Sequence, residues 1–256
     1  PWLKSYKLGP YQLKKTLETY PKTPIYKFLD DAAEAYPGQV AVEYLGRKIR
    51  YNELRQYVDR LANALVGLGV KKGDRVATIL PNCPQFIITD FAASKTGGVL
   101  VPCSTLHKIH DLEYEIGTSG AETVVCSDAA LGLVMSIKEK TKLRNIIVTS
   151  PMDYAAQEPE VKTVPGAHQF KDLIAQHEPN PPHVDIDPMN DLAYLSFTGG
   201  ATGVPKGVMI THYNRACNVR QALWTLEPLW PGLKGKAATE LVVPLFHSYG
   251  HLGMHV

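Results

Sequence analysis

The feature that most constrains this chain is a loop rich in glycine and threonine, set between two strand-like runs. The runs cover residues 192–197 and 207–211, and the loop between them reads Thr-Gly-Gly-Ala-Thr-Gly-Val-Pro-Lys. Three glycines in the loop allow positive φ and let a ligand touch the backbone: Gly199, Gly200 and Gly203. Successive exposed N–H groups form a concavity that suits anions. Two hydroxyls and one positive charge come from Thr198, Thr202 and Lys206. The expected ligand is therefore a polyphosphate.

The loop departs from two common glycine-rich loops that bind nucleotides. A Walker A loop reads G-x-x-x-x-G-K-[ST] and opens directly into a helix. Pro205 before the lysine, Gly207 after it and the strand-like run that follows exclude that loop. The T-G-x-x-x-G-x-G loop of short-chain dehydrogenases needs glycine where Pro205 stands and a helix that opens at the third glycine. A glycine-rich surface hairpin without a ligand stays open at this point.

The loop resembles the phosphate-binding signature of the adenylate-forming superfamily, which includes acyl-CoA synthetases, luciferases and peptide-synthetase adenylation domains. The usual form of that signature is Thr-(Ser/Thr/Gly)-Gly-Thr-Thr-Gly-x-Pro-Lys-Gly, and nine of its ten positions match residues 198–207. The exception is Ala201, where the family has threonine, so one hydroxyl is missing while the backbone donors remain. Gly199 and the Gly-Val-Met-Ile-Thr-His-Tyr-Asn that ends the stretch are most like the long-chain fatty acyl-CoA ligase branch. The likeness extends over residues 25–256.

Composition and charge exclude several classes of protein. The chain has 256 residues, 45% of them hydrophobic, and a net charge of +2. Basic residues form no run of five, so no nucleic-acid partner is expected. No apolar run reaches about 18 residues, so no transmembrane segment is expected. Four cysteines without a C-x-x-C pair indicate reduced thiols in a cytoplasmic protein. A peripheral membrane contact and a homodimer stay open.

Short strand-like runs alternate with amphipathic helices along the chain. The clearest helix covers residues 52–68, where leucine and valine recur at spacings of 4, 3, 4 and 3. This alternation predicts an α/β fold, with mostly parallel sheets flanked by helices. A proline-rich connector at residues 179–188 predicts two α/β subdomains, residues 1–185 and 186–256, the second of them incomplete. A surface excursion within one domain is the alternative. Because the chain starts at proline and stops inside an apolar stretch, it is expected to be a piece of a longer protein.

A second group of residues, Pro-Leu-Phe-His-Ser-Tyr-Gly at 244–250, follows a β-like run at residues 239–243. It resembles the family's Pro-x-Phe-His-x-x-Gly motif, which implies that Phe246, His247 and Tyr249 line the acid-binding pocket. A competing interpretation is a metal site, because histidines recur at i, i+4 and i+8 from His247. The glutamate of zinc peptidases is absent from that spacing, and two glycines weaken a helix there. A buried histidine bonded to the backbone is the plain alternative.

The resemblance implies an ATP-dependent fatty acid–CoA ligase of fatty acid metabolism. A carboxylic acid and ATP would give acyl-AMP and pyrophosphate, and coenzyme A would then take the acyl group. By resemblance, Thr198 contacts Mg²⁺ or its phosphates, and Lys206 and His247 act in catalysis. The nucleotide phosphates would be held by Gly199, Gly200, Ala201, Thr202 and Gly203, together with Lys206. The alternatives are an enzyme that passes the acyl group to a carrier-protein thiol, and a non-catalytic nucleotide-binding module.

Overall fold

The computed structural model describes residues 19–157, 164–198, 203–226, 232 and 235–256. Seven strands form one sheet in the order β7-β6-β5-β3-β4-β8-β9. All neighbouring strands are parallel except β8 and β9, which pair antiparallel. The strands are β3 (Arg75–Ile79), β4 (Val99–Pro102), β5 (Thr123–Ser127), β6 (Asn145–Thr149), β7 (His168–Gln169), β8 (Leu192–Thr198) and β9 (Lys206–Thr211). A separate hairpin consists of β1 (Val40–Tyr44) and β2 (Arg47–Arg50).

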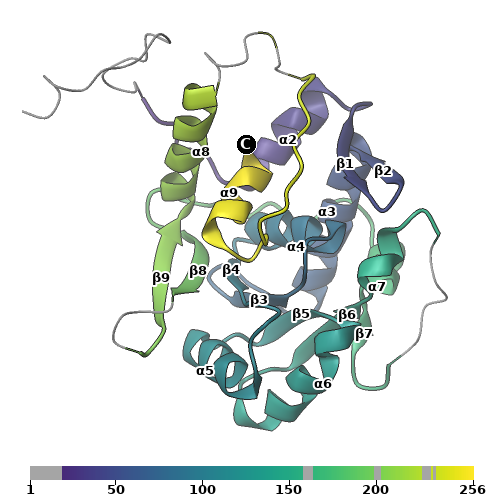
Figure 1. Cartoon of the computed structure of the whole chain (residues 1–256), viewed down its shortest axis with the longest axis vertical. Coiled ribbons are helices and arrows are strands. Elements are labelled where there is room, and N and C mark those ends of the chain that lie inside the picture. Colours follow the sequence, from purple (N-terminus) through teal and green to yellow (C-terminus); the bar gives the residue numbers. More distant parts are fainter. Residues whose placement is uncertain (1–18, 158–163, 199–202, 227–231, 233–234) are drawn as a thin grey trace, which may run out of the picture.

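Helices cover both faces of this sheet, as Figure 1 shows. One face carries α5 (Ile109–Ser119) and α6 (Asp128–Ile137), below the sheet in that view. The other face carries α2 (Tyr26–Ala35), α3 (Tyr51–Gly67), α4 (Pro84–Lys95) and α7 (Phe170–Gln176). Two more helices, α8 (His212–Leu226) and α9 (Ser248–His255), follow β9. Short 3₁₀ turns lie at Lys138–Lys140 and Pro151–Tyr154. The predicted α/β fold with a mostly parallel sheet is confirmed.

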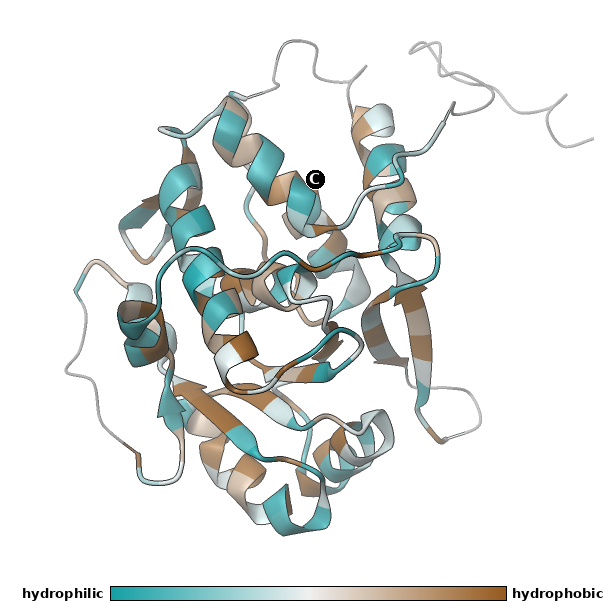
Figure 2. Ribbon diagram, turned by 180° about the vertical axis from the view of Figure 1, so that it is seen from behind, coloured by the Kyte–Doolittle hydropathy of each residue, from teal (hydrophilic) through white to brown (hydrophobic). Residues whose placement is uncertain are grey.

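Two apolar cores result, one on each side of the sheet. Alternate strand residues point to opposite faces, so Val76 joins the core under α3 and α4 while its neighbour Ala77 joins the core under α5 and α6. The hydrophobic strands stand out in Figure 2. Helix α3 buries the predicted stripe through Leu54, Val58 and Leu61, among others. This burial explains why the leucine and valine spacing predicted the helix to within a residue of its bounds.

The two halves of the sequence share this one sheet. Strand β8 pairs with β4 through a single registered pair, Leu100 with Tyr194. The stretch between α7 and β8 forms neither helix nor strand, and the predicted boundary at residue 185 falls inside it. The division into two subdomains at that point stays a prediction.

The expected β-like run at residues 239–243 is wrong. These residues are described, and they form no strand. Their valines favour extended backbone, but β-propensity measures the fit to neighbouring strands more than a backbone preference. No strand among the described residues pairs with this stretch, and the side chain of Asn82 takes two of its carbonyls instead.

Candidate functional site

The predicted phosphate-binding loop closes a β-hairpin. Thr198, the last residue of β8, lies opposite Lys206, the first residue of β9, and both side chains are exposed. Gly203 has a φ of +83°, a conformation that glycine adopts without strain. Because β8 runs parallel to β4, the loop lies at the carboxyl edge of the sheet, where open α/β sheets bind ligands. The other predicted loop residues, Gly199, Gly200, Ala201 and Thr202, lie outside the described residues.

A tyrosine from α5 supports the far arm of this loop. The Tyr114 hydroxyl donates a hydrogen bond to the Pro205 carbonyl over 3.0 Å, next to Lys206. Its ring meets the ring of Phe197 edge-on, with centroids 6.2 Å apart. The first half of the chain thus contacts both arms of the hairpin, one residue from Thr198 and one from Lys206.

The predicted acid-binding segment, residues 244–249, leads into α9 and includes its first two residues, Ser248 and Tyr249. Leu245 is buried, Phe246 is half-buried against the core, and His247 and Tyr249 are exposed. His247 caps α9, because its Nδ1 accepts a hydrogen bond from the Tyr249 backbone N–H at 3.3 Å. The alternative of a buried His247 is therefore wrong. Because the side chains of His247 and Tyr249 are exposed, both are accessible to a ligand.

A buried polar network lies on the other side of α9. Both oxygens of Asp90, in α4, accept from α9: one from His251 Nε2 at 3.0 Å and the other from His255 Nε2 at 2.8 Å. Asp90, His251 and His255 are all buried. A guanidinium nitrogen of Arg215, in α8, lies 3.5 Å from His251 Nδ1, and the guanidinium stacks over the Tyr194 ring at 4.9 Å. The network therefore ties α4, β8, α8 and α9 together.

The metal interpretation of the three histidines is wrong for His247, which lies outside this network. Asp90, His251 and His255 do place three ligand atoms within 4.8 Å of one another. Arginine can only donate, however, so His251 Nδ1 accepts from Arg215 and its Nε2 carries the proton given to Asp90. A metal on that Nε2 would turn an N–H towards the guanidinium. The donor set fits hydrogen bonding better than a cation.

The charges in this network determine which groups are ionised. Burial alone would raise the pKa of Asp90, but donation from His251 and His255 outweighs burial and holds the pKa below its usual range. Burial lowers the pKa of His251 to about 4 and lowers that of His255, against the raising effect of Asp90. The network at neutral pH consists of one carboxylate, one guanidinium and two neutral imidazoles.

These shifts predict a loss of stability in mild acid. Above pH 6.5 neither the folded nor the unfolded state protonates these imidazoles, so the full stability is present. Between pH 6.5 and about 4 the unfolded chain binds protons that folded His251 does not. We expect His251 to lower the free energy of unfolding by about 2 kcal/mol at pH 5, and His255 to add to this loss. Urea unfolding at about pH 7.5 and about pH 5 measures this change, and equal midpoints at the two values would contradict it.

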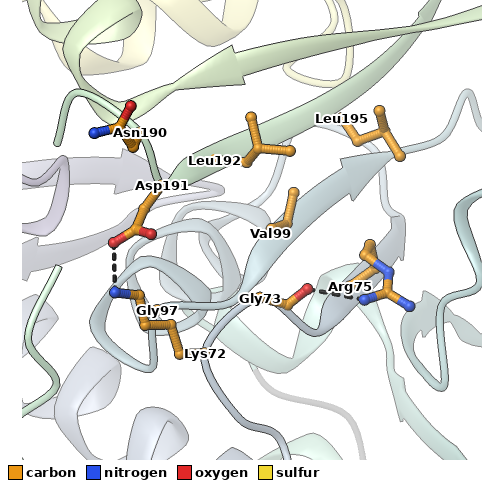
Figure 3. A pocket seen from close by; sticks show the side chains of 9 residues that line it. All are labelled: Lys72, Gly73, Arg75, Gly97, Val99, Asn190, Asp191, Leu192 and Leu195. Atoms are coloured by element: carbon orange, nitrogen blue, oxygen red, sulfur yellow. Dashed lines mark hydrogen bonds and ion pairs between the residues drawn. The ribbon is translucent and has the colours of Figure 1, made fainter. Parts of the chain in front are cut away.

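A cavity of about 290 Å³ opens at the opposite edge of the sheet (Figure 3). It adjoins the first residues of β3, β4 and β8, which are Arg75, Val99 and Leu192. Its cations already have partners: Lys72 pairs with Asp191 at 2.7 Å, and Arg75 donates to three backbone carbonyls. The cavity is remote from the loop, and no cation among the described residues that line it is left to receive an anion.

The sequence motifs did not reveal the residues whose side chains support the loop at 198–206 and the segment at 244–249. Tyr114, Asn82, Asp90 and Arg215 act through partners far away in the chain. One local signal existed: Asp90 is the single carboxylate in the largely apolar helix Pro84–Lys95. A buried carboxylate requires a partner, so its position could have pointed to the histidines.

Comparison with known proteins agrees with this geometry. The family described as AMP-binding enzyme matches residues 29–256, and the chain belongs to that family. It is 31% identical over 267 residues to a long-chain-fatty-acid–CoA ligase of Bacillus subtilis, covering 98% of this chain and 46% of the relative. It is 29% identical to the ligase of that name from Salmonella typhimurium, covering 88% of this chain and 43% of the relative. The chain thus spans less than half the length of these relatives.

Solved structures share the fold. A long-chain-fatty-acid-CoA ligase from Archaeoglobus fulgidus superposes with a TM-score of 0.74 at 23% identity, over 95% of this chain and 47% of that one. ATP-bound MatB from Rhodopseudomonas palustris gives a TM-score of 0.70 at 25% identity, over 90% of this chain and 42% of that one.

Among the described residues, no helix has the length and apolar character that crossing a bilayer requires.

Proposed function

We propose that the complete protein is an ATP-dependent fatty acid–CoA ligase and that this chain supplies its phosphate-binding loop and acid-binding segment. The acid and ATP give acyl-AMP and pyrophosphate, and the thiol of coenzyme A then displaces AMP. The observation that carries the proposal is the phosphate-binding hairpin at the carboxyl edge of the sheet in a chain of the AMP-binding family. Relatives named long-chain-fatty-acid–CoA ligase support a fatty acid as the substrate.

The first step needs positioning and charge rather than a protein base. The substrate carboxylate is already the nucleophile at the α-phosphorus, so catalysis rests on alignment and on stabilising negative charge. Lys206, exposed at the start of β9, supplies positive charge beside the pyrophosphate. The backbone N–H groups of residues 199–203 hold the β- and γ-phosphates, and Ala201 does so without the usual hydroxyl.

A magnesium ion fits the exposed oxygen at this loop. Mg²⁺ prefers oxygen ligands and keeps waters and phosphates in its shell. The Thr198 hydroxyl, at the loop end of the hairpin, would hold it together with the nucleotide. When bound, the ion neutralises charge on the phosphates.

On the acid side, Phe246 and Tyr249 flank the acyl chain and His247 positions the carboxylate.

Acid-dependent ATP–pyrophosphate exchange by the complete protein tests this function. We expect exchange with longer acids in a series from acetate to palmitate, and none from the 256-residue chain alone, which covers 46% of a curated relative. A requirement for coenzyme A in product formation separates the ligase from an enzyme that loads a carrier protein. Nucleotide binding without exchange for any acid would favour the non-catalytic module and make Ala201→Thr the first variant to test.

Replacing Lys206 with alanine is expected to slow adenylation. Removing one group that stabilises transition-state charge typically costs about 10²–10³-fold in rate. Acid-dependent pyrophosphate exchange measures the effect in the complete protein, with Lys206→Arg as the variant that keeps the charge. An unchanged exchange rate in the alanine variant would remove Lys206 from the reaction.

A further inference from the structure

One amide side chain holds the backbone ahead of the acid-binding segment at three points. Asn82 Nδ2 donates to the Leu241 carbonyl at 2.8 Å and to the Val243 carbonyl at 3.0 Å. Its Oδ1 accepts from the Leu245 N–H at 2.8 Å. Both donor hydrogens and the oxygen are therefore used, and the pattern fixes which way the amide faces. These partners lie 159 to 163 residues away in the sequence.

The three bonded residues are alternate ones. The chain bends at Val243 and turns from Leu245, so its backbone curves around the amide instead of running straight. Residues 241–245 have no strand partner among the described residues, and the side chain of Asn82 satisfies three of their backbone groups. The bonds from Asn82 therefore fix a curved path for a run whose composition favours a strand.

Asn82 itself lies on a fixed base. It follows β3 at the carboxyl edge of the sheet and stands between two prolines, Pro81 and Pro84. Helix α4 begins two residues later, and eleven of its residues are buried. Proline restricts backbone rotation, and a buried helix cannot shift without disturbing the core. The amide is therefore placed by the first half of the chain.

The acid-binding segment is thus held at both ends. Asn82 fixes Leu245, two residues before His247, while Asp90 fixes His251, one helical turn after it. A tight turn between these anchors is closed by the His247 N–H, which donates to the Pro244 carbonyl at 3.0 Å. The position of His247 relative to the sheet therefore follows from contacts within the protein itself.

We propose that Asn82 is a positioning residue for the carboxylic acid substrate, a role that rests on the proposed function. It acts through the backbone of residues 241–245, which places Phe246 and His247. Tyr114 plays the corresponding part for the nucleotide, because its hydroxyl holds Pro205 beside Lys206. The two contacts lie on different halves of the site, so each variant serves as the control for the other.

The test compares two near-isosteric variants in the complete protein. Asn82→Asp keeps the acceptor for Leu245 but loses both donors and sets a carboxylate against two carbonyls. We expect kcat/KM for the acid to fall about 10- to 100-fold through a higher acid KM, with the ATP KM within about twofold of wild type. Tyr114→Phe keeps the ring and should raise the ATP KM instead. Asn63→Asp, a half-buried asparagine remote from the site that also donates to a backbone carbonyl, should change neither constant.

Three outcomes would overturn the proposal. Equal changes in the acid and ATP KM of Asn82→Asp, or no change in either, would show that the contact does not position the acid. A readout independent of turnover is hydrogen exchange at the Leu245 amide, which should speed up about 10-fold in Asn82→Ala. Unchanged exchange would remove the anchor while leaving the ligase function standing. Faster exchange in a protein that turns over no acid would remove the ligase function and leave the anchor.

Discussion

Replacing Asp90 with alanine is expected to destabilise the protein by about 3–5 kcal/mol, the range for leaving a buried charge without compensation. The substitution removes the acceptor of both His251 and His255 and leaves the Arg215 guanidinium buried without its counter-charge. The network also sits among aromatic rings: Phe86 and Tyr194 meet His251 edge-on at 5.6 and 4.5 Å. Water therefore has little room to replace the lost carboxylate.

The free energy of unfolding, from urea titration at about pH 7.5, measures this effect. Asp31→Ala is the matched control, because that exposed carboxylate pairs with Lys27 in a surface ion pair, which is worth about 0–1 kcal/mol. A loss below about 1 kcal/mol for Asp90→Ala would mean that the network is not needed for stability. Asp90→Asn keeps the shape and separates charge from packing, since an asparagine has one acceptor oxygen and can accept from only one of the two histidines.

Gly250→Ala is expected to distort the start of α9. A methyl group at this position would lie 2.3 Å from the Pro244 carbonyl oxygen and 2.7 Å from that of Val243. These are backbone atoms of the turn that places His247, so they cannot move aside as a flexible side chain would. Overpacking of this kind costs about 1–3 kcal/mol, occasionally more. We expect a lower urea midpoint and loss of acid-dependent exchange together.

Gly253→Ala, in the same helix, is the control for this substitution. Its methyl group would meet Leu241 Cδ2 at 3.0 Å, the end of a side chain that can rotate away. Alanine is also favoured over glycine inside a helix by about 1 kcal/mol. Stability should therefore hold or rise in this variant. If Gly250→Ala were as stable and as active as Gly253→Ala, the turn before α9 would not require a glycine at position 250.

Local pattern predicted most of the sheet and its helices. The spacing of Leu54, Val58 and Leu61 predicted both ends of α3 to within a residue. A helix buried on one face has apolar residues that recur with a period of about 3.6 residues, and this period is visible in the sequence. The strand-like runs at residues 192–197 and 207–211 likewise predicted a strand on each side of the loop, which β8 and β9 confirm. Such features depend on neighbours a few residues apart, so one sequence suffices to find them.

Long-range polar contacts could not be predicted in the same way. Asn82 finds its backbone partners about 160 residues later, and nothing periodic marks the pairing. The two histidines of α9 did show a helical spacing, but the sequence joined them to His247 and a metal rather than to Asp90. The β-rich run at 239–243 misled for a related reason: its partner is a side chain, and strand propensity does not register that. The Tyr114 contact with Pro205 belongs to the same class.

The arrangement of Asn82 and Asp90 bears on how the acid preference of the proposed ligase could be redesigned. Both residues belong to the stretch from β3 through α4, and both hold the segment that contains Phe246 and His247. Exchanging residues 241–255 alone with those of a relative would pair a foreign segment with Asn82 and Asp90, which bind this segment in the present chain. A working chimera would have to carry residues 80–95 along with it, so these two distant stretches should be treated as one interchangeable module.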